Sequence, residues 1–205
     1  MTTSTGRESV PRRLLLAILF LPRRTIRQLV ATNPEYLVYS LAILESGVQV
    51  VRYGVGGPLG DLPLPVILLV AVVVAPVSGL LSLFIAGELL RWIGGRFGGQ
   101  ASGEEVRAAV AWSSVPSILG SLVGILGLLV AGQESDAVLG WYPVELLLIT
   151  WAFVLLVRCI EEVHRFSLWR ASVTTALAGL VLSLPRLCLF VVDILLNRAF
   201  YGRLI

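Results

Sequence analysis

The sequence predicts an all-α protein, a polytopic membrane helix bundle of five transmembrane helices preceded by an amphipathic interfacial helix. Composition is the first observation behind this prediction: 57% of the 205 residues are hydrophobic and only 14% are charged, whereas soluble domains carry roughly 25% charged residues. The mean hydropathy of +0.89 agrees. The second observation is that apolar runs of bilayer-spanning length, about 20 residues, recur between short polar or glycine-rich stretches. Five such spans leave room for loops but not for a sizeable soluble domain.

The segment before the first span is rich in arginine. We divide it into a disordered tail at residues 1–10 and a basic amphipathic interfacial segment at residues 11–32, with the membrane domain following at 33–200. At 100° per residue, five arginines share an arc of about 120° opposite leucine and isoleucine side chains; they are Arg12, Arg13, Arg23, Arg24 and Arg27. We expect them to meet anionic lipid headgroups. Two alternatives stay open: Pro22 could split the helix, and the segment could be a charged tail that only fixes orientation.

The first expected span, residues 36–53, follows Asn33-Pro34, which suits a helix start with proline in the first turn. Glu45 and Gln49 interrupt its apolar character, as does Arg52 near its end. Polar groups at membrane depth face protein or water more readily than lipid. We therefore expect this helix to present Glu45 and Gln49 to other helices or to a polar crevice.

The second expected span, residues 62–90, carries no charge as far as Gly87, and Pro76 and Gly79 are placed to kink or tilt it. After a glycine-rich turn, Ser102 and Glu105 have the spacing of a capping box that starts the third helix. That third span is expected at residues 106–131.

Small residues recur in the third span at alternating separations of four and three, which places them on one face of a helix. Within a bilayer, a small face lets two helix backbones approach closely and is a main source of association. We therefore assign helix packing to this face: Ser113, Ser117, Gly120, Gly124 and Gly127.

The fourth expected span covers residues 140–157, and Trp141 and Tyr142 at its start are typical of the aromatic belt at a membrane interface. A charged loop is expected at 158–170. The fifth span, residues 171–196, contains Arg186 and Asp193, which are seven residues apart and so share a face.

Arginine also predicts the orientation of the chain, because positively charged loops stay on the cytoplasmic side. With five spans, one side collects twelve arginines: Arg7, Arg12, Arg13, Arg23, Arg24, Arg27, Arg91, Arg96, Arg107, Arg158, Arg165 and Arg170. The other side has only Arg52, Arg198 and Arg203. We expect the cytoplasmic membrane of a prokaryotic cell, with the N-terminus inside and the C-terminus outside.

No motif predicts catalysis, a metal site or a cofactor. The single histidine, His164, has neither a catalytic serine motif nor a second histidine as partner, and the Gly94–Gly99 stretch lacks the lysine and preceding strand of a phosphate loop. Arginines clustered outside the apolar runs suit lipid headgroups and not nucleic acid. We expect a protein that is not an enzyme.

Several short stretches, taken in order, resemble the Yip family of Ypt/Rab-interacting membrane proteins. The segments that carry the likeness are Leu21-Pro-Arg-Arg-Thr-Ile-Arg27, Asn33-Pro34, Gly56-Gly-Pro-Leu-Gly60, Leu90-Arg-Trp-Ile-Gly-Gly95, Ala111-Trp-Ser-Ser-Val-Pro116 and Glu162-Val-His-Arg-Phe166. The resemblance implies a five-helix membrane domain with a cytosolic N-terminus, associated in eukaryotic relatives with vesicle trafficking and small GTPases. Because the long N-terminal region of those relatives is missing here, the chain is more similar to the short prokaryotic members, and we expect no binding to a Rab GTPase. The resemblance supplies no catalytic residues.

Two functions fit these observations. The first is a nonenzymatic, membrane-organising or scaffold role, in which the basic segment engages anionic lipid and small faces serve helix packing or contact with a second copy or another membrane protein. The alternative is a small transporter or channel that uses Glu45, Gln49, Arg186 and Asp193, since ionisable groups at membrane depth are functional candidates.

Overall fold

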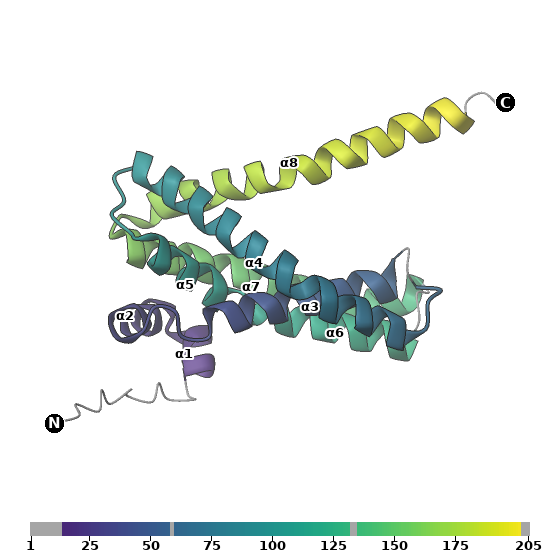
Figure 1. The fold of residues 1–205 in the computed structure, drawn as a ribbon, viewed down its shortest axis with the longest axis horizontal. Helices are drawn as coiled ribbons and strands as arrows, with labels where there is room; N and C mark the ends of the chain where they lie inside the picture. The colour runs from purple at the N-terminus through teal and green to yellow at the C-terminus, as the bar shows by residue number, and fades with distance from the viewer. Residues whose placement is uncertain (1–13, 58–59, 132–134, 202–205) are drawn as a thin grey trace.

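The computed structural model describes residues 14–57, 60–131 and 135–201, and the regular elements among these residues are all α-helices. Two short helices near the N-terminus, α1 and α2, lie beside a bundle formed by α3, α4, the α5–α6 pair, α7 and α8 (Figure 1). In chain order the elements are α1 (Leu14–Phe20), α2 (Pro22–Thr32), α3 (Val38–Gly56), α4 (Leu64–Arg96), α5 (Gly103–Ser113), α6 (Val115–Ala131), α7 (Ser135–His164) and α8 (Leu168–Tyr201).

Four segments among the described residues are long and apolar enough to cross a membrane: Leu64–Arg96, Gly103–Val130, Gly140–His164 and Leu168–Pro185. The chain is therefore a multi-pass helical membrane protein. Helix α3 is not among these four. It nevertheless packs lengthwise against α4 and α6, while α8 diverges from the bundle toward the C-terminus (Figure 1).

The most completely buried side chains gather where α1, α2, α5 and α7 meet. Ile18, Ile26 and Trp112 are essentially without exposure, and Ile160 of α7 packs into the same core. The indole Nε1 of Trp112 donates to the carbonyl of Tyr36 at 3.1 Å, which satisfies its polar group inside this core. The two N-terminal helices are thereby packed onto the bundle.

The capping box predicted at the start of the third span is confirmed. The Ser102 hydroxyl accepts from the Glu105 amide at 3.2 Å, and the Glu105 carboxylate accepts from the Ser102 amide at 2.7 Å. Two amide groups that a helix start leaves without partners are satisfied in this way.

The predicted start of the first span was wrong. Helix α3 begins at Val38, and residues 34–37 form turns. The residue before a proline is held in an extended conformation, and Asn33 accordingly has φ −159° and ψ 96°. Its side-chain oxygen accepts from the amide of Glu35 at 3.2 Å, which favours a turn over a helix start.

The third span is two helices and not one, because the helix is interrupted at Ser114. Pro116 has no amide hydrogen to bond the carbonyl four residues earlier. The hydroxyls of Ser113 and Ser114 donate to the carbonyls of Val110 and Ala111, at 2.9 and 2.8 Å. The Ala111 carbonyl also accepts from the Ser114 amide at 3.4 Å, so hydroxyls supplement the backbone hydrogen bonds around the interruption.

The structure decides one alternative that the sequence left open and corrects one predicted boundary. The interfacial segment forms two helices, α1 and α2, because Pro22 interrupts it and starts the second. The charged stretch predicted as a loop at 158–170 is helical as far as His164, which leaves only residues 165–167 between α7 and α8. Charged residues do not end a helix when their side chains find partners on its surface, as Glu161 and Glu162 do.

Candidate functional site

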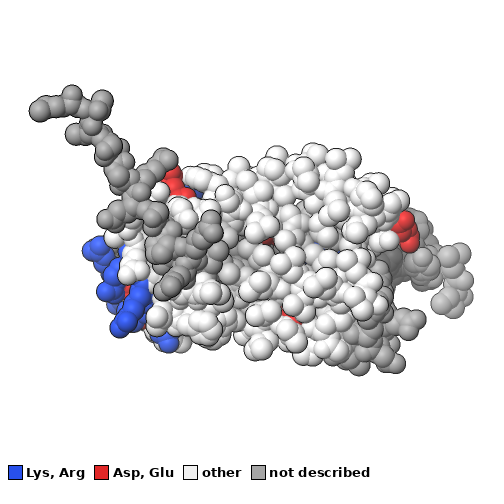
Figure 2. All heavy atoms as spheres, turned by 90° about the horizontal axis from the view of Figure 1, so that it is seen from below, with Lys and Arg blue, Asp and Glu red and all other residues white. Residues whose placement is uncertain are grey.

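Helix α2 carries its arginines on the exposed face and its apolar residues on the buried face. Arg23, Arg24 and Arg27 are exposed, whereas Ile26 and Leu29 are buried against the bundle. Basic side chains gather at the end of the molecule where α2 lies, and most of the rest of the face shown in Figure 2 is without charge. Arg12 and Arg13, which the sequence placed on the same arc, lie outside the described residues. The contact of this end with a membrane surface stays a prediction.

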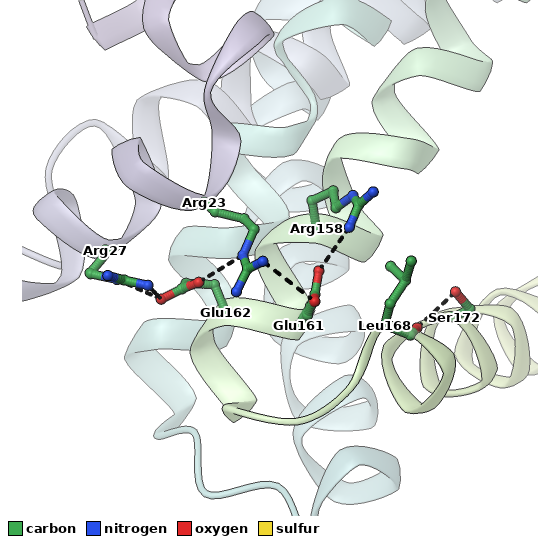
Figure 3. Close-up of polar contacts among 7 residues, drawn as sticks. All are labelled: Arg23, Arg27, Arg158, Glu161, Glu162, Leu168 and Ser172. Atoms are coloured by element: carbon green, nitrogen blue, oxygen red, sulfur yellow. Dashed lines mark hydrogen bonds and ion pairs between the residues drawn. The ribbon is translucent and has the colours of Figure 1, made fainter.

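Two carboxylates at the end of α7 hold the arginines of α2 (Figure 3). Glu162 accepts from Arg23 at 3.0 Å and from Arg27 at 2.6 Å, and Glu161 lies 3.7 Å from Arg23. Arg158 reaches Glu161 from one turn earlier at 3.2 Å. The hydrogen bond to Glu162 raises the pKa of Arg23 above its ordinary value. These pairs add to the burial of Ile26 and Leu29 in positioning α2 on the bundle.

The arginine side chains remain open to solvent despite these ion pairs. Arg23 is 51% exposed and Arg27 69% exposed, while their carboxylate partners are only about a tenth exposed. Arg24 and Arg165 are exposed and have no ion pair among the residues that the structure describes. A groove of about 730 Å³ between α2, α5 and α7 is lined by Arg23, Arg27 and Arg165, together with the carboxylates Glu105, Glu161 and Glu162. The arrangement can accept an anionic group at its outer surface.

The polar residues expected in the first span do line a crevice. Glu45 and Gln49 of α3 face a space of about 580 Å³ bounded by α3, α4, α5, α6 and α7. The hydroxyl of Ser117, a residue assigned to the small face of the third span, donates to Glu45 at 3.0 Å.

The sequence did not single out Glu145, a carboxylate within the candidate span Gly140–His164. Glu145 of α7 accepts two hydrogen bonds from Arg52 of α3, each at 3.1 Å, with the side chains only 8% and 18% exposed. The guanidinium also stacks 5.1 Å from the centre of the Trp141 ring. Glu145 stands alone among apolar residues in the sequence. A glutamate in such a run is itself a reason to expect a polar partner at membrane depth.

The glycines of the small face lie against α7 and this ion pair. Gly120 lies against Leu148 and the backbone of Glu145, Gly124 lies against Arg52 and Glu145, and Gly127 lies against the Trp141 ring. A side-chain carbon at Gly124 would come within 2.5 Å of Arg52 Nε and 2.8 Å of Glu145 Oε2. The face therefore contacts a helix of the same chain. Ser113 at its other end is buried.

Arg186 and Asp193 fall within α8, but their side chains lie outside the described residues. His164, which the sequence placed in a loop, instead ends α7 and is 1% exposed. Its ring stacks on Phe166 at 4.9 Å between centroids, and Gly94 and Gly99 lie directly against it. Within the part of the chain that the structure describes, no group of His, Cys, Asp and Glu residues could hold a metal ion.

One family model matches most of the chain. A model of the Yip1 domain matches residues 16–188. No curated protein and no solved structure matches the chain.

Proposed function

The chain belongs to the Yip1 domain family, and from this premise we propose that it is a nonenzymatic, membrane-organising protein of the prokaryotic cytoplasmic membrane. The observation that carries the proposal is the docked basic helix α2, whose exposed arginines are held in place by Glu161 and Glu162. A rigidly placed row of arginines meets lipid phosphates without first losing the conformational freedom of a loose tail. Anionic lipid is the partner that this surface fits.

Contacts at the two ends of the bundle support a proposed placement of the chain in the membrane. Arg170 donates to the carbonyl of Phe97 at 3.3 Å, and Arg23 pairs with Glu162, so α2 and the connections after α4 and α7 share one end of the bundle. The Arg52–Glu145 pair lies toward the other end of α3. With 19 residues, α3 is about 28 Å long, close to the thickness of the hydrocarbon core. These facts support α3 as a fifth span, with the basic end inside and the C-terminus outside.

The small face of α6 is not proposed as a contact with other proteins, because α7 of the same chain covers it. A second copy or another membrane protein would instead meet the outer surfaces of the bundle.

Transport is the second candidate function, favoured by the polar crevice around Glu45. The scaffold role is preferred because the basic side chains concentrate at one end of the molecule (Figure 2), where a membrane-organising protein would use them.

Lipid selectivity tests the proposed function. We expect the full-length protein, reconstituted in phosphatidylcholine, to enrich spin-labelled phosphatidylglycerol over spin-labelled phosphatidylcholine in the lipid shell seen by electron paramagnetic resonance. Each arginine near the surface contributes about 1 kcal/mol. The Arg24→Gln/Arg165→Gln protein should therefore lose about fivefold of the preference per arginine, as these side chains lack internal partners among the described residues.

Gln28→Ala is the matched control, since it alters an exposed side chain of α2 without changing its charge. High salt should weaken the preference of the wild-type protein, because the interaction is between exposed charges. Equal partitioning of the two spin-labelled lipids in the wild-type protein would exclude the proposed lipid contact.

A further inference from the structure

The crevice between α3, α4, α5, α6 and α7 opens to the surface of the bundle, and its lining selects the chemistry of a ligand. It is bounded by five helices and holds about 580 Å³, within the size range of small-molecule sites. Glu45 and six serines supply most of its polar surface, and side chains such as Leu83, Phe153 and Leu156 supply its apolar surface.

The serine hydroxyls are used as donors within the protein. Each hydroxyl has one hydrogen to donate and two lone pairs to accept with. Three of them donate to carbonyls of their own helices: Ser82 to Ser78 at 2.6 Å, Ser113 to Val110 at 2.9 Å and Ser114 to Ala111 at 2.8 Å. Their oxygen lone pairs remain as acceptors.

The other three serines form the same pattern. Ser78 donates to the carbonyl of Val74 at 2.8 Å, and its oxygen is 2.6 Å from the hydroxyl of Ser46, which then acts as the donor of that pair. Ser117 donates to Glu45. The crevice therefore offers many acceptors, and its remaining side-chain donors are the amide of Gln49 and the hydroxyl of Tyr53.

The charge of the crevice also favours a ligand that donates hydrogen bonds. Glu45 is the only charged residue among the described residues that line it. Arg52, one helical turn further along α3 beyond Gln49, is engaged by Glu145 through two hydrogen bonds. A carboxylate can accept about four hydrogen bonds; Ser117 supplies one of them, and the Ser114 hydroxyl is also within hydrogen-bonding reach of Glu45. A ligand with positive charge and N–H donors would complete this site.

We propose that the crevice binds a protonated organic amine, whose ammonium group donates to Glu45 and to the serine oxygens while its small apolar body contacts Leu83, Phe153 and Leu156. A bare metal ion would leave the apolar part of the space unfilled, and a phosphate-bearing ligand would meet acceptors and a negative charge. Binding here goes beyond the lipid contact of α2. The transport candidate would require it, but the site does not depend on transport.

The test measures, by calorimetry, the binding of 2-phenylethylammonium to the full-length protein in phosphatidylcholine nanodiscs. We expect saturable binding, with 2-phenylethanol and 3-phenylpropanoate at least about tenfold weaker, because a hydrogen bond to a charged group is worth more than a neutral one. Glu45→Gln should weaken binding of the ammonium at least about tenfold. Partitioning of the probe into lipid is the same for every variant, so differences between variants report on the site.

Two further variants keep the result decisive. Ala152→Phe fills the crevice without altering its charge and should abolish binding, whereas Glu104→Gln removes an exposed carboxylate outside the crevice and should leave binding unchanged. Unchanged affinity in Glu45→Gln or in Ala152→Phe would overturn the proposal, as would equal affinity for the alcohol. If sodium ions competed with the ammonium probe equally well, the site would recognise positive charge alone. That result would overturn the proposal as well. Lipid selectivity measured on the same variants should not change, which separates this proposal from the function of α2.

Discussion

Glu145→Leu is expected to destabilise the protein by about 3–5 kcal/mol, the cost of removing one partner from a buried ion pair. The substitution leaves the Arg52 guanidinium, only 18% exposed, without the two hydrogen bonds that it makes in the wild-type protein. Trp141 would still cover one face of the guanidinium, but a ring face does not replace a carboxylate. Reversible unfolding in mixed micelles of maltoside and dodecyl sulfate measures the free energy of unfolding.

The double variant Arg52→Met/Glu145→Leu identifies the cause of this loss. Removing both charges together is often neutral or stabilising, so the double variant should recover most of the stability. Glu88→Gln serves as the matched control, because Glu88 pairs with Arg91 at 2.7 Å while both side chains are 49% exposed, and an exposed pair contributes about 1 kcal/mol at most. A double variant as unstable as Glu145→Leu would contradict the assigned role of the ion pair.

Gly79→Ala is expected to cost about 2–3 kcal/mol, because α3 and α4 approach each other at this glycine through their backbones. An added side-chain carbon would lie 2.6 Å from the carbonyl oxygen of Ala42 and 3.0 Å from Cα of Ile43. Neither contact can be relieved by rotating a side chain, so the two helices must separate. The same unfolding assay measures the loss.

Gly179→Ala is the control for Gly79→Ala. Gly179 is an exposed helical glycine of α8, and an added carbon would meet nothing within 4 Å. Alanine is favoured over glycine in a helix by roughly 1 kcal/mol, so this variant should be as stable as the wild-type protein or more so. A Gly79→Ala protein that gained stability to the same extent would show that α3 and α4 do not approach closely at this point.

Much of the helical organisation could be predicted from the sequence because it depends on local signals. The uncharged stretch from Leu62 to Gly87 lies almost entirely within α4, and the capping box formed by Ser102 and Glu105 starts α5. Hydropathy and capping act over one or two turns, so one sequence is enough to find them.

Local prolines account for some of the differences, at Pro22, Pro34 and Pro116, whereas two others involve residues far apart in the chain. Helix α7 extends past Arg158 because Glu161 and Glu162 find partners on α2, more than 130 positions earlier in the chain. Glu145 was missed for the same reason, since its partner Arg52 is 93 residues away. A periodicity argument places a residue on a helix face, but it does not say which helix covers that face.

The family assignment agrees with the resemblance drawn from the short motifs, and the structure adds what the motifs could not supply. The match covers residues 16–188, a range that includes the basic helix α2, the Glu45 crevice and the Arg52–Glu145 pair. The first of these is exposed at one end of the molecule, whereas the other two lie within the bundle. The proposed lipid-contacting surface and the proposed amine site are therefore separable by mutation.

The central claim is that the chain crosses the membrane five times with its basic end inside. Cysteine accessibility in intact cells tests it with two single substitutions, Gln28→Cys in α2 and Ser135→Cys at the start of α7, both in a Cys188→Ala background that keeps the buried Cys159. We predict that an impermeant maleimide labels residue 135 from outside, and labels residue 28 only after the membrane is permeabilised. Because α3, α4 and the α5–α6 pair separate these positions, labelling of both from the same side would mean that α3 does not cross the membrane, and would contradict the account.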